Sequence, residues 1–312
     1  MIGYPILSIR NITKSFNGKE ILQGVSLDFN QGEIFGIIGP SGSGKTVLFK
    51  TIAGFYKQDQ GELKFNHDTN QIAQQLIGFS TQTQKFYSGL TPIENMQYFG
   101  TMYNLTGKEI KTRTQGLLKL VSLDYAQDKK SGELSGGMQR RLDLALALIH
   151  NPPILLLDEP TSGLDPILRT QILELIQRIR QQGTTIIIAS HFVDEIEPIC
   201  DRIGIMKDGR IIALGKPVEI RNRNANIHKI KLRTYPGNYS TIISKLIKTF
   251  NILEYQIKEG ELHFIVSQVT DTKYYLDSIS TQIETLNEKL ITISIDKSPF
   301  EEVFEEIIKN VD

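Results

Sequence analysis

The stretch Gly39-Pro40-Ser41-Gly42-Ser43-Gly44-Lys45-Thr46 is the most informative part of this chain. An apolar run from Glu33 to Ile38 precedes it and an apolar-periodic stretch from Val47 to Ala53 follows it, which predicts a strand, a loop and a helix. Glycines let consecutive backbone N–H groups turn toward one centre, and the start of the helix adds positive dipole. We expect this phosphate loop (Gly39–Thr46) to hold a polyphosphate, with Lys45 at the β and γ phosphates and Thr46 on Mg²⁺; an ordinary glycine turn is the alternative.

Composition places the chain in the globular class. Its 312 residues are 40% hydrophobic and 22% charged, which is enough for two domains with sizeable cores. Lys plus Arg equals Asp plus Glu at 35 each, so the whole-chain charge gives no strong attraction to nucleic acid or to an acidic membrane. Cys200 is the single cysteine, the first residues lack a signal-peptide pattern, and no apolar run approaches the length of a membrane span. We therefore expect a cytoplasmic protein that meets a membrane only through a partner.

The pattern of apolar residues predicts an α/β first domain over residues 1–221. Residues 6–29 read as antiparallel strands, and residues from about 85 to 150 read as a helical insert. The aliphatic runs Ile154–Leu157 and Thr185–Ala189 are typical of buried parallel strands, with a helix between them. A hairpin turn at Lys207–Arg210 follows.

A smaller α+β domain is predicted over residues 222–312. Its segments read in the order strand, helix, strand, strand, helix, strand, which is the order of a ferredoxin-like unit. Near the end, apolar residues are spaced for one face of a helix: Phe300, Val303, Phe304, Ile307 and Ile308. We expect this helix to pack on its own domain, with a partner-binding helix as the alternative.

Two adjacent carboxylates end the predicted strand at Ile154–Leu157. Asp158 and Glu159 would lie at the carboxyl edge of the sheet, beside the phosphates. Asp158 can hold Mg²⁺, and Glu159 can polarise the water that attacks the γ phosphate. A surface turn is the alternative for such a pair on its own.

The segment Leu134-Ser135-Gly136-Gly137-Met138 opens directly into a predicted helix. Its N–H groups and the Ser135 hydroxyl suit a second phosphate contact, and a simple helix cap explains them equally well. Together with the phosphate loop and Asp158-Glu159, the segment resembles the nucleotide-binding subunits of ATP-binding cassette (ABC) transporters, from about residue 6 to residue 220. Met138 departs from the family's usual glutamine.

This resemblance implies a fold and a dimer. The fold would be the P-loop NTPase core of ABC type, with an antiparallel β subdomain and a helical insert. The phosphate loop would be the Walker A motif, the Asp158 strand Walker B, and Leu134–Met138 the signature motif. In the family, the residues that match Ser135 and Gly137 bind the γ phosphate of the nucleotide held by the other subunit, and Gly136 between them is expected in the same nucleotide-binding segment. A homodimer would suffice for two competent sites, and a heterodimer stays open.

Four single residues gain roles from the same resemblance. Gln82 is similar to the Q-loop glutamine that contacts Mg²⁺ or the attacking water, and His191 to the switch histidine at the γ phosphate. Asp165 resembles the D-loop aspartate that couples the two sites, and it also suits a cap before Pro166. Phe16 matches the aromatic residue that stacks on adenine, where the family more often has tyrosine. The non-functional alternatives are a solvated loop residue for Gln82, a structural or exposed histidine for His191, and an edge-strand core residue for Phe16.

We therefore expect a Mg²⁺-dependent ATPase that powers transport through separate integral membrane permease subunits, to which it would attach at the cytoplasmic face. The stretch Ser190–Ile203 and the segment Ser298–Phe304 resemble those of drug, antibiotic and polysaccharide exporters, although Phe300 and Glu302 depart from the usual tail of that subgroup. This resemblance favours export over import. A soluble ATPase acting on nucleic acid or ribosomes is the alternative; no nucleic-acid partner is expected, because the chain lacks a second cassette, a long coiled coil and zinc-binding cysteines. A binding module without catalysis is disfavoured, because Lys45, Asp158, Glu159 and His191 are all present.

Overall fold

The computed structural model describes residues 5–66, 73–83, 85–223, 228–266, 272–297 and 300–309. Residues 1–4, where we expect no signal sequence, lie outside them. The chain divides into two compact units, Met1–Lys216 and Pro217–Asp312. Residue 222, the expected start of the second domain, lies within helix α8 (Pro217–Arg223) of the second unit.

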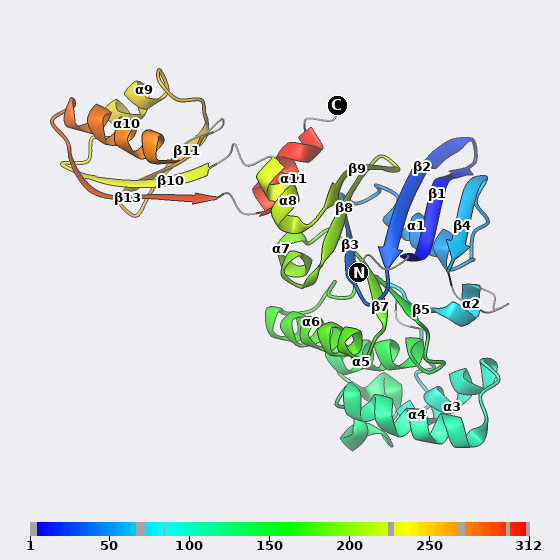
Figure 1. The fold of residues 1–312 in the computed structure, drawn as a ribbon. Coiled ribbons are helices and arrows are strands. Elements are labelled where there is room, and N and C mark those ends of the chain that lie inside the picture. The colour runs from blue at the N-terminus through cyan, green and yellow to red at the C-terminus, as the bar shows by residue number, and fades with distance from the viewer. Residues whose placement is uncertain are drawn as a thin grey trace. The chain divides into compact units, whose positions relative to one another are not determined.

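A six-stranded sheet forms the centre of the first unit (Figure 1). Its strand order is β5 (Ile77–Ser80), β6 (Ile154–Asp158), β7 (Thr185–Ser190), β3 (Ile34–Ile38), β8 (Arg202–Lys207) and β9 (Arg210–Gly215). Neighbouring strands from β5 to β8 are parallel, and β9 returns antiparallel through the predicted hairpin. Every residue of β3, β6 and β7 is buried, because α helices cover both faces of such a sheet.

Three antiparallel strands form the predicted β subdomain. Strand β1 (Pro5–Phe16) lies between β2 (Lys19–Asn30) and β4 (Gln60–Phe65). Their inward side chains share one core with α1 (Lys45–Ile52), in which Phe29 meets Phe35 edge to face with ring centroids 4.9 Å apart. The phosphate loop therefore leaves a rigid strand and enters a helix that is packed on two sheets.

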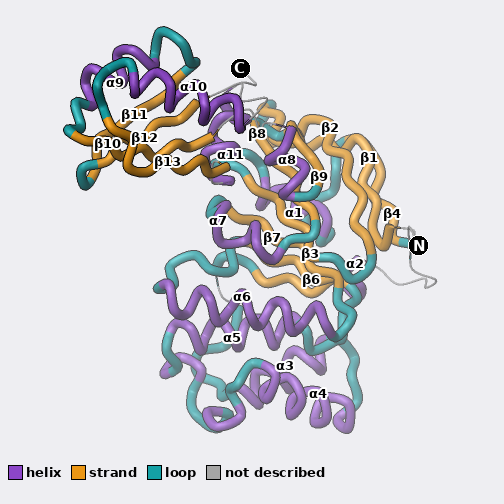
Figure 2. The backbone as a smooth tube through the Cα atoms, turned by 60° about the vertical axis from the view of Figure 1, so that its left-hand side comes forward, coloured by secondary structure: helices purple, strands orange, loops and turns teal. Residues whose placement is uncertain are grey.

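The helical insert contains α3 (Pro92–Met102), α4 (Gly107–Leu120) and α5 (Gly136–Ala147), and α3 and α4 lie together at one end of the first unit in Figures 1 and 2. Thr91 caps α3 in a reciprocal pair with Glu94. The remaining helices of this unit are α2 (Ala73–Leu76), α6 (Pro166–Gln181) and α7 (Val193–Ile196), with 3₁₀ turns at Asp124–Ala126, Ser131–Glu133 and Glu197–Ile199.

The second unit confirms the ferredoxin-like prediction. Its strands are β10 (His228–Tyr235), β11 (Ile252–Lys258), β12 (Glu261–Val266) and β13 (Lys289–Lys297), in the antiparallel order β11-β12-β10-β13. Helices α9 (Tyr239–Leu246) and α10 (Thr272–Glu284) lie on one face of this sheet (Figure 2). Helix α11 (Phe300–Lys309) buries Phe300, Val303 and Ile307 and contacts α8 of the same unit. Its Glu302 lies 3.4 Å from Lys229 of β10.

Candidate functional site

Four neighbouring parallel strands bring the predicted site residues to one edge of the central sheet. The carboxyl ends of β5, β6, β7 and β3 lead into Gln82, Asp158-Glu159, His191 and the phosphate loop, respectively. The register matches Ile38 with Ser190 and Asp158 with Ala189, so these strands end at the same level. Ligands of open α/β sheets bind at this edge.

Close packing shapes the phosphate loop. Gly42 and Gly44 have φ of +84° and +106°, a conformation that favours glycine. A Cβ on Gly39 would lie 2.2 Å from the Met206 carbonyl oxygen, so only glycine fits there. The hydroxyl of Ser43 is buried with no hydrogen-bond partner among the described residues, which leaves a polar group for a ligand to satisfy.

Lys45 lies across this loop. Its Nζ donates hydrogen bonds to the carbonyl oxygens of Gly39 (2.7 Å) and Pro40 (3.1 Å). Burial lowers the pKa of Lys45, while the nearby carboxylates of Glu159 and Asp158 act in the opposite direction. The ammonium group is therefore held inside the loop, where a polyphosphate would be its natural counter-ion.

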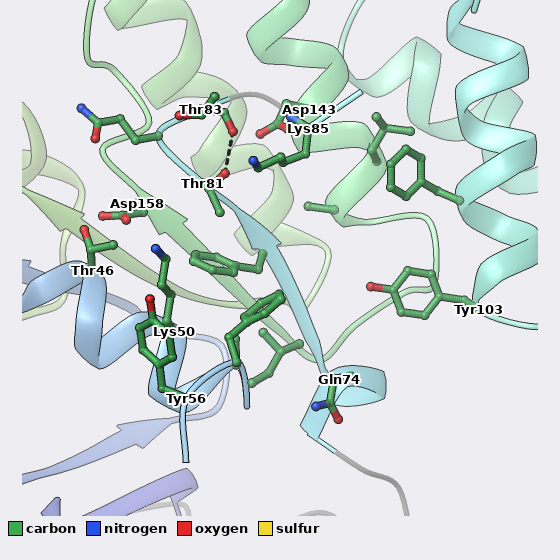
Figure 3. Close-up of a pocket in the computed structure, with 18 residues that line it drawn as sticks. Thr46, Lys50, Tyr56, Gln74, Thr81, Thr83, Lys85, Tyr103, Asp143 and Asp158 are labelled. Atoms are coloured by element: carbon green, nitrogen blue, oxygen red, sulfur yellow. Dashed lines mark hydrogen bonds between the residues drawn. The ribbon is translucent and has the colours of Figure 1, made fainter. Parts of the chain in front are cut away.

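Asp158 and Thr46 form the arrangement expected of a divalent-cation site. Burial raises the pKa of Asp158, and a hydrogen bond from Thr46 opposes that effect. Figure 3 shows the two side chains next to each other at one end of a cleft. Asp158 Oδ1 is buried and accepts no hydrogen bond within the described part of the chain, so an oxygen ligand is available. A carboxylate and a hydroxyl are donors that Mg²⁺ prefers, and the residues therefore fit this ion.

Glu159 and His191 lie side by side. His191 Nδ1 is 2.8 Å from Glu159 Oε2, although this oxygen accepts no hydrogen bond of good geometry within the described residues. The backbone of Glu159 is in the left-handed region, with φ of +54°, and its N–H donates to the Ala189 carbonyl at 2.9 Å. Such a strained conformation in a residue with a side chain is typical of functional sites. The turn directs the Glu159 carboxylate away from the path of the strand and toward His191.

The signature segment and Asp165 act as helix caps in this structure. Ser135 is the N-cap of α5, and its Oγ accepts from the N–H of Met138 at 3.4 Å. Asp165 is the N-cap of α6 and accepts from the N–H groups of Ile167 and Leu168, both at 3.0 Å. Ser135, Gly136 and Asp165 are exposed, so these caps leave them accessible.

Gln82 lies in the wall of a cleft of about 670 Å³ between the core and the helical insert. Thr46 and Asp158 line one end of the cleft, and Tyr103 lies at the other in Figure 3. The cleft is mostly apolar, with Phe55, Phe79 and Leu146 in its lining. Gln82 thus borders both the candidate cation site and the helical insert.

Phe16 ends strand β1 with 37% of its surface exposed. Its ring meets Tyr56 edge to face at 5.1 Å, and the ammonium of Lys14 lies 5.4 Å from its centroid. One ring face is therefore partly accessible, as stacking on a base requires.

Arg140 is a buried residue of the site that sequence reasoning missed. Only 4% of Arg140 is exposed, and its guanidinium donates to the carbonyl oxygens of Thr81 (2.8 Å), Glu159 (3.1 Å) and Pro160 (2.9 Å). Arg140 therefore connects helix α5, which begins in the signature segment, to the backbone beside Gln82 and to the turn that carries Glu159.

Asp143 completes this connection. It lies 3.6 Å from Arg140, and it accepts from the Ser80 hydroxyl at 2.5 Å and from the Lys85 N–H at 3.0 Å. These two donors flank the segment that holds Gln82. Opposite charges three residues apart on one helix, at Arg140 and Asp143, were the available signal in the sequence.

A family profile and several characterised relatives all match this chain to ATP-binding proteins of ABC transporters. The profile described as "ABC transporter" matches residues 22–162. The linearmycin resistance ATP-binding protein LnrL of Bacillus subtilis (strain 168) is 32% identical over 304 residues, 96% of this chain and 97% of that protein. The Nod factor export ATP-binding protein I of Ralstonia nicotianae is 36% identical, covering 69% of this chain and 68% of that protein. The spermidine/putrescine import ATP-binding protein PotA of Photobacterium profundum is 34% identical, covering 82% of this chain and 66% of that protein.

Solved structures similar to this chain are also ATP-binding cassettes of ABC transporters. The ADP conformation of MJ1267, an ATP-binding cassette of an ABC transporter, matches with a TM-score of 0.62 and 30% identity over 69% of this chain and 92% of that one. The dimeric structure of MJ0796, a bacterial ABC transporter cassette, matches with a TM-score of 0.60 and 30% identity over 67% and 98%, respectively. Among the described residues, no helix is both long enough and apolar enough to span a bilayer.

Proposed function

Since this chain belongs to the ABC transporter family and is its ATP-binding subunit, we propose that it hydrolyses Mg²⁺-bound ATP to drive export through separate permease subunits. The observation that carries the proposal is the convergence of the phosphate loop, Asp158, Glu159, Gln82 and His191 on one sheet edge. Each of these groups has a task in phosphoryl transfer to water, and they meet where a nucleotide would lie.

We assign the roles as follows. The N–H groups of the loop and the Lys45 ammonium bind the phosphates, while Thr46, Asp158 and Gln82 would hold Mg²⁺. When bound, this cation would neutralise charge on the β and γ phosphates. Glu159 accepts a proton from the attacking water, and His191, 2.8 Å from it, orients its carboxylate and contacts the γ phosphate.

Glu159→Gln tests the catalytic assignment. The amide keeps the size of the side chain but accepts no proton, so ATP turnover should fall by about 10²–10⁴-fold while ATP still binds. Steady-state phosphate release and binding of a fluorescent ATP analogue measure the two effects. Glu174→Gln, an exposed position on α6, is the matched control. Unchanged hydrolysis by Glu159→Gln would remove this assignment.

The working form would be a dimer of two copies with ATP at the shared boundary. One chain carries both the phosphate loop and the signature segment Leu134–Met138. The exposed Ser135 and Gly136 can therefore contact a nucleotide bound to a second copy. The dimeric MJ0796 cassette supports this arrangement. Phe16 would stack on adenine, and Asp165 would lie at the boundary between the copies.

Export is favoured by the match to LnrL, which extends further along both chains than the matches to the import proteins PotA and FbpC. The match to LnrL, a resistance ATP-binding protein, includes the second unit and nearly the full length of both chains. The match to the import protein PotA leaves about a third of that protein uncovered. The proposed cargo is therefore a compound that leaves the cell.

A permease would dock in the cleft beside Gln82. The cleft is mostly apolar, and Phe55 at its rim has 68% of its surface exposed. A permease segment seated there would touch Gln82, whose neighbours in the cleft wall are Thr46 and Asp158. Movement at the nucleotide could then pass to the membrane subunits.

Affinity isolation from gently solubilised membranes tests this docking. We expect a polytopic membrane protein to co-purify with the chain, and Phe55→Ser to reduce its recovery. Tyr274→Ser, an exposed aromatic position on α10 of the second unit and outside the cleft, is the control. Recovery of ribosomes or nucleic acid without a membrane protein would contradict the transporter proposal and favour the soluble alternative.

A further inference from the structure

Strand β11 leaves an apolar edge uncovered in the second unit. It pairs with β12 on one side, and its other side pairs with no strand in the described part of this unit. Tyr255 and Ile257 are 50% and 54% exposed, although they stand opposite Phe264 and Leu262, which are buried in the domain core. An exposed edge strand with apolar side chains is a template for pairing with another strand.

The sequence of β11 is complementary to itself when two copies run antiparallel. With Gln256 opposite its own copy, Tyr255 stands opposite Ile257 and Glu254 stands opposite Lys258. The first pairing joins an aromatic and a β-branched residue on the face that carries the helices. The second joins opposite charges on the open face, and both pairings stabilise antiparallel sheets.

The local backbone limits this pairing to five residues. A register irregularity lies between Ile252 and Glu254, and the left-handed residues Glu259 and Gly260 turn the chain directly after Lys258. The segment 254–258 is therefore a short, regular edge bounded on both sides. Glu254 and Lys258 carry opposite charges at equal distances from Gln256, so a two-fold axis at Gln256 brings each charge against its opposite on the other copy.

We infer that a second copy of this chain pairs with it through β11, joining the two ferredoxin-like sheets into one. This contact goes beyond the proposed function, because it needs no nucleotide and involves none of the residues of the ATP site. It would keep two subunits associated after hydrolysis opens the ATP-bound dimer.

A charge swap in the full chain tests the contact. Without nucleotide, sedimentation velocity should show a reversible dimer at micromolar concentration. Glu254→Lys places two lysines opposite each other twice per dimer and should weaken association about tenfold, as should Lys258→Glu. The double variant Glu254→Lys/Lys258→Glu restores both pairs and should recover the dimer. Circular dichroism checks that each variant is folded.

Disulfide trapping gives a second measurement. Gln256→Cys should cross-link two copies under mild oxidation, because this residue meets itself, whereas Glu254→Cys should not. A monomeric chain without nucleotide, a double swap that fails to recover, or no Gln256→Cys cross-link would each overturn the inference. These outcomes are distinct from failure of the proposed function, which appears as loss of the effect of Glu159→Gln on ATP turnover.

Discussion

Replacing Arg140 by methionine should destabilise the first unit and slow ATP turnover together. Arg140 and Asp143 are each 4% exposed, and their charged groups lie 3.6 Å apart. Methionine fills much of the arginine volume but leaves the Asp143 carboxylate buried without its counter-charge. Removal of one partner of a buried pair costs about 3–5 kcal/mol, which sets the expected loss of unfolding free energy.

The loss of activity follows from the same contacts. Without the guanidinium, the carbonyl oxygens of Thr81 and Glu159 lose their donor, so the backbones beside Gln82 and at the proposed base become less ordered. We expect kcat to fall at least about tenfold while ATP affinity changes little, since the phosphate loop makes none of these hydrogen bonds. Urea unfolding followed by circular dichroism and steady-state kinetics measure the two effects.

A double-mutant cycle separates the pair from general damage. Asp143→Asn in the Arg140→Met background removes the stranded charge, so the double variant should lose about 1–3 kcal/mol less than the sum of the single variants. Arg141→Met is the control, because within the described residues Arg141 donates only to the carbonyls of Val121 and Ser122, at 3.3 and 3.4 Å. Additive losses, or an Arg140→Met variant within 1 kcal/mol of the natural chain, would refute this reasoning.

Three further predictions follow from single contacts. Gly39→Ala should lower the unfolding free energy by roughly 1–3 kcal/mol and weaken ATP binding, because its Cβ would lie 2.2 Å from the Met206 carbonyl oxygen. Gly116→Ala, in open space on α4, is the control and should not destabilise the chain. Calorimetry measures stability, and an ATP titration measures binding. Burial lowers the pKa of His150 to about 4, so the folded chain resists its protonation and should lose up to about 3 kcal/mol as the pH falls from about 6.5 toward 4; urea unfolding across that range should show a smaller loss for His150→Gln. Phe16→Ala should weaken binding of an ATP analogue about tenfold and Phe16→Tyr should not, and equal affinities would argue against stacking on adenine.

The fold class and the main motifs could be predicted from local sequence. The glycines of the phosphate loop, the aliphatic runs ending at Asp158 and Ser190, and the alternating strands of the first 30 residues each report their own conformation. The ferredoxin-like unit could be predicted equally well, because the periodicity of its apolar residues indicates the order of its strands and helices. Such signals are local, since backbone propensity and burial of one face act over a few residues.

Contacts between distant segments had no such signal. The buried link from Arg140 to Thr81 and Glu159, the 2.8 Å approach of His191 to Glu159, and the left-handed turn at Glu159 arise only when separate strands and helices pack together. Likewise, only the sheet order left β11 at an edge with Tyr255 and Ile257 exposed. A charged or apolar residue carries the same propensity wherever it stands, and its partner is chosen by the burial and geometry of the folded chain.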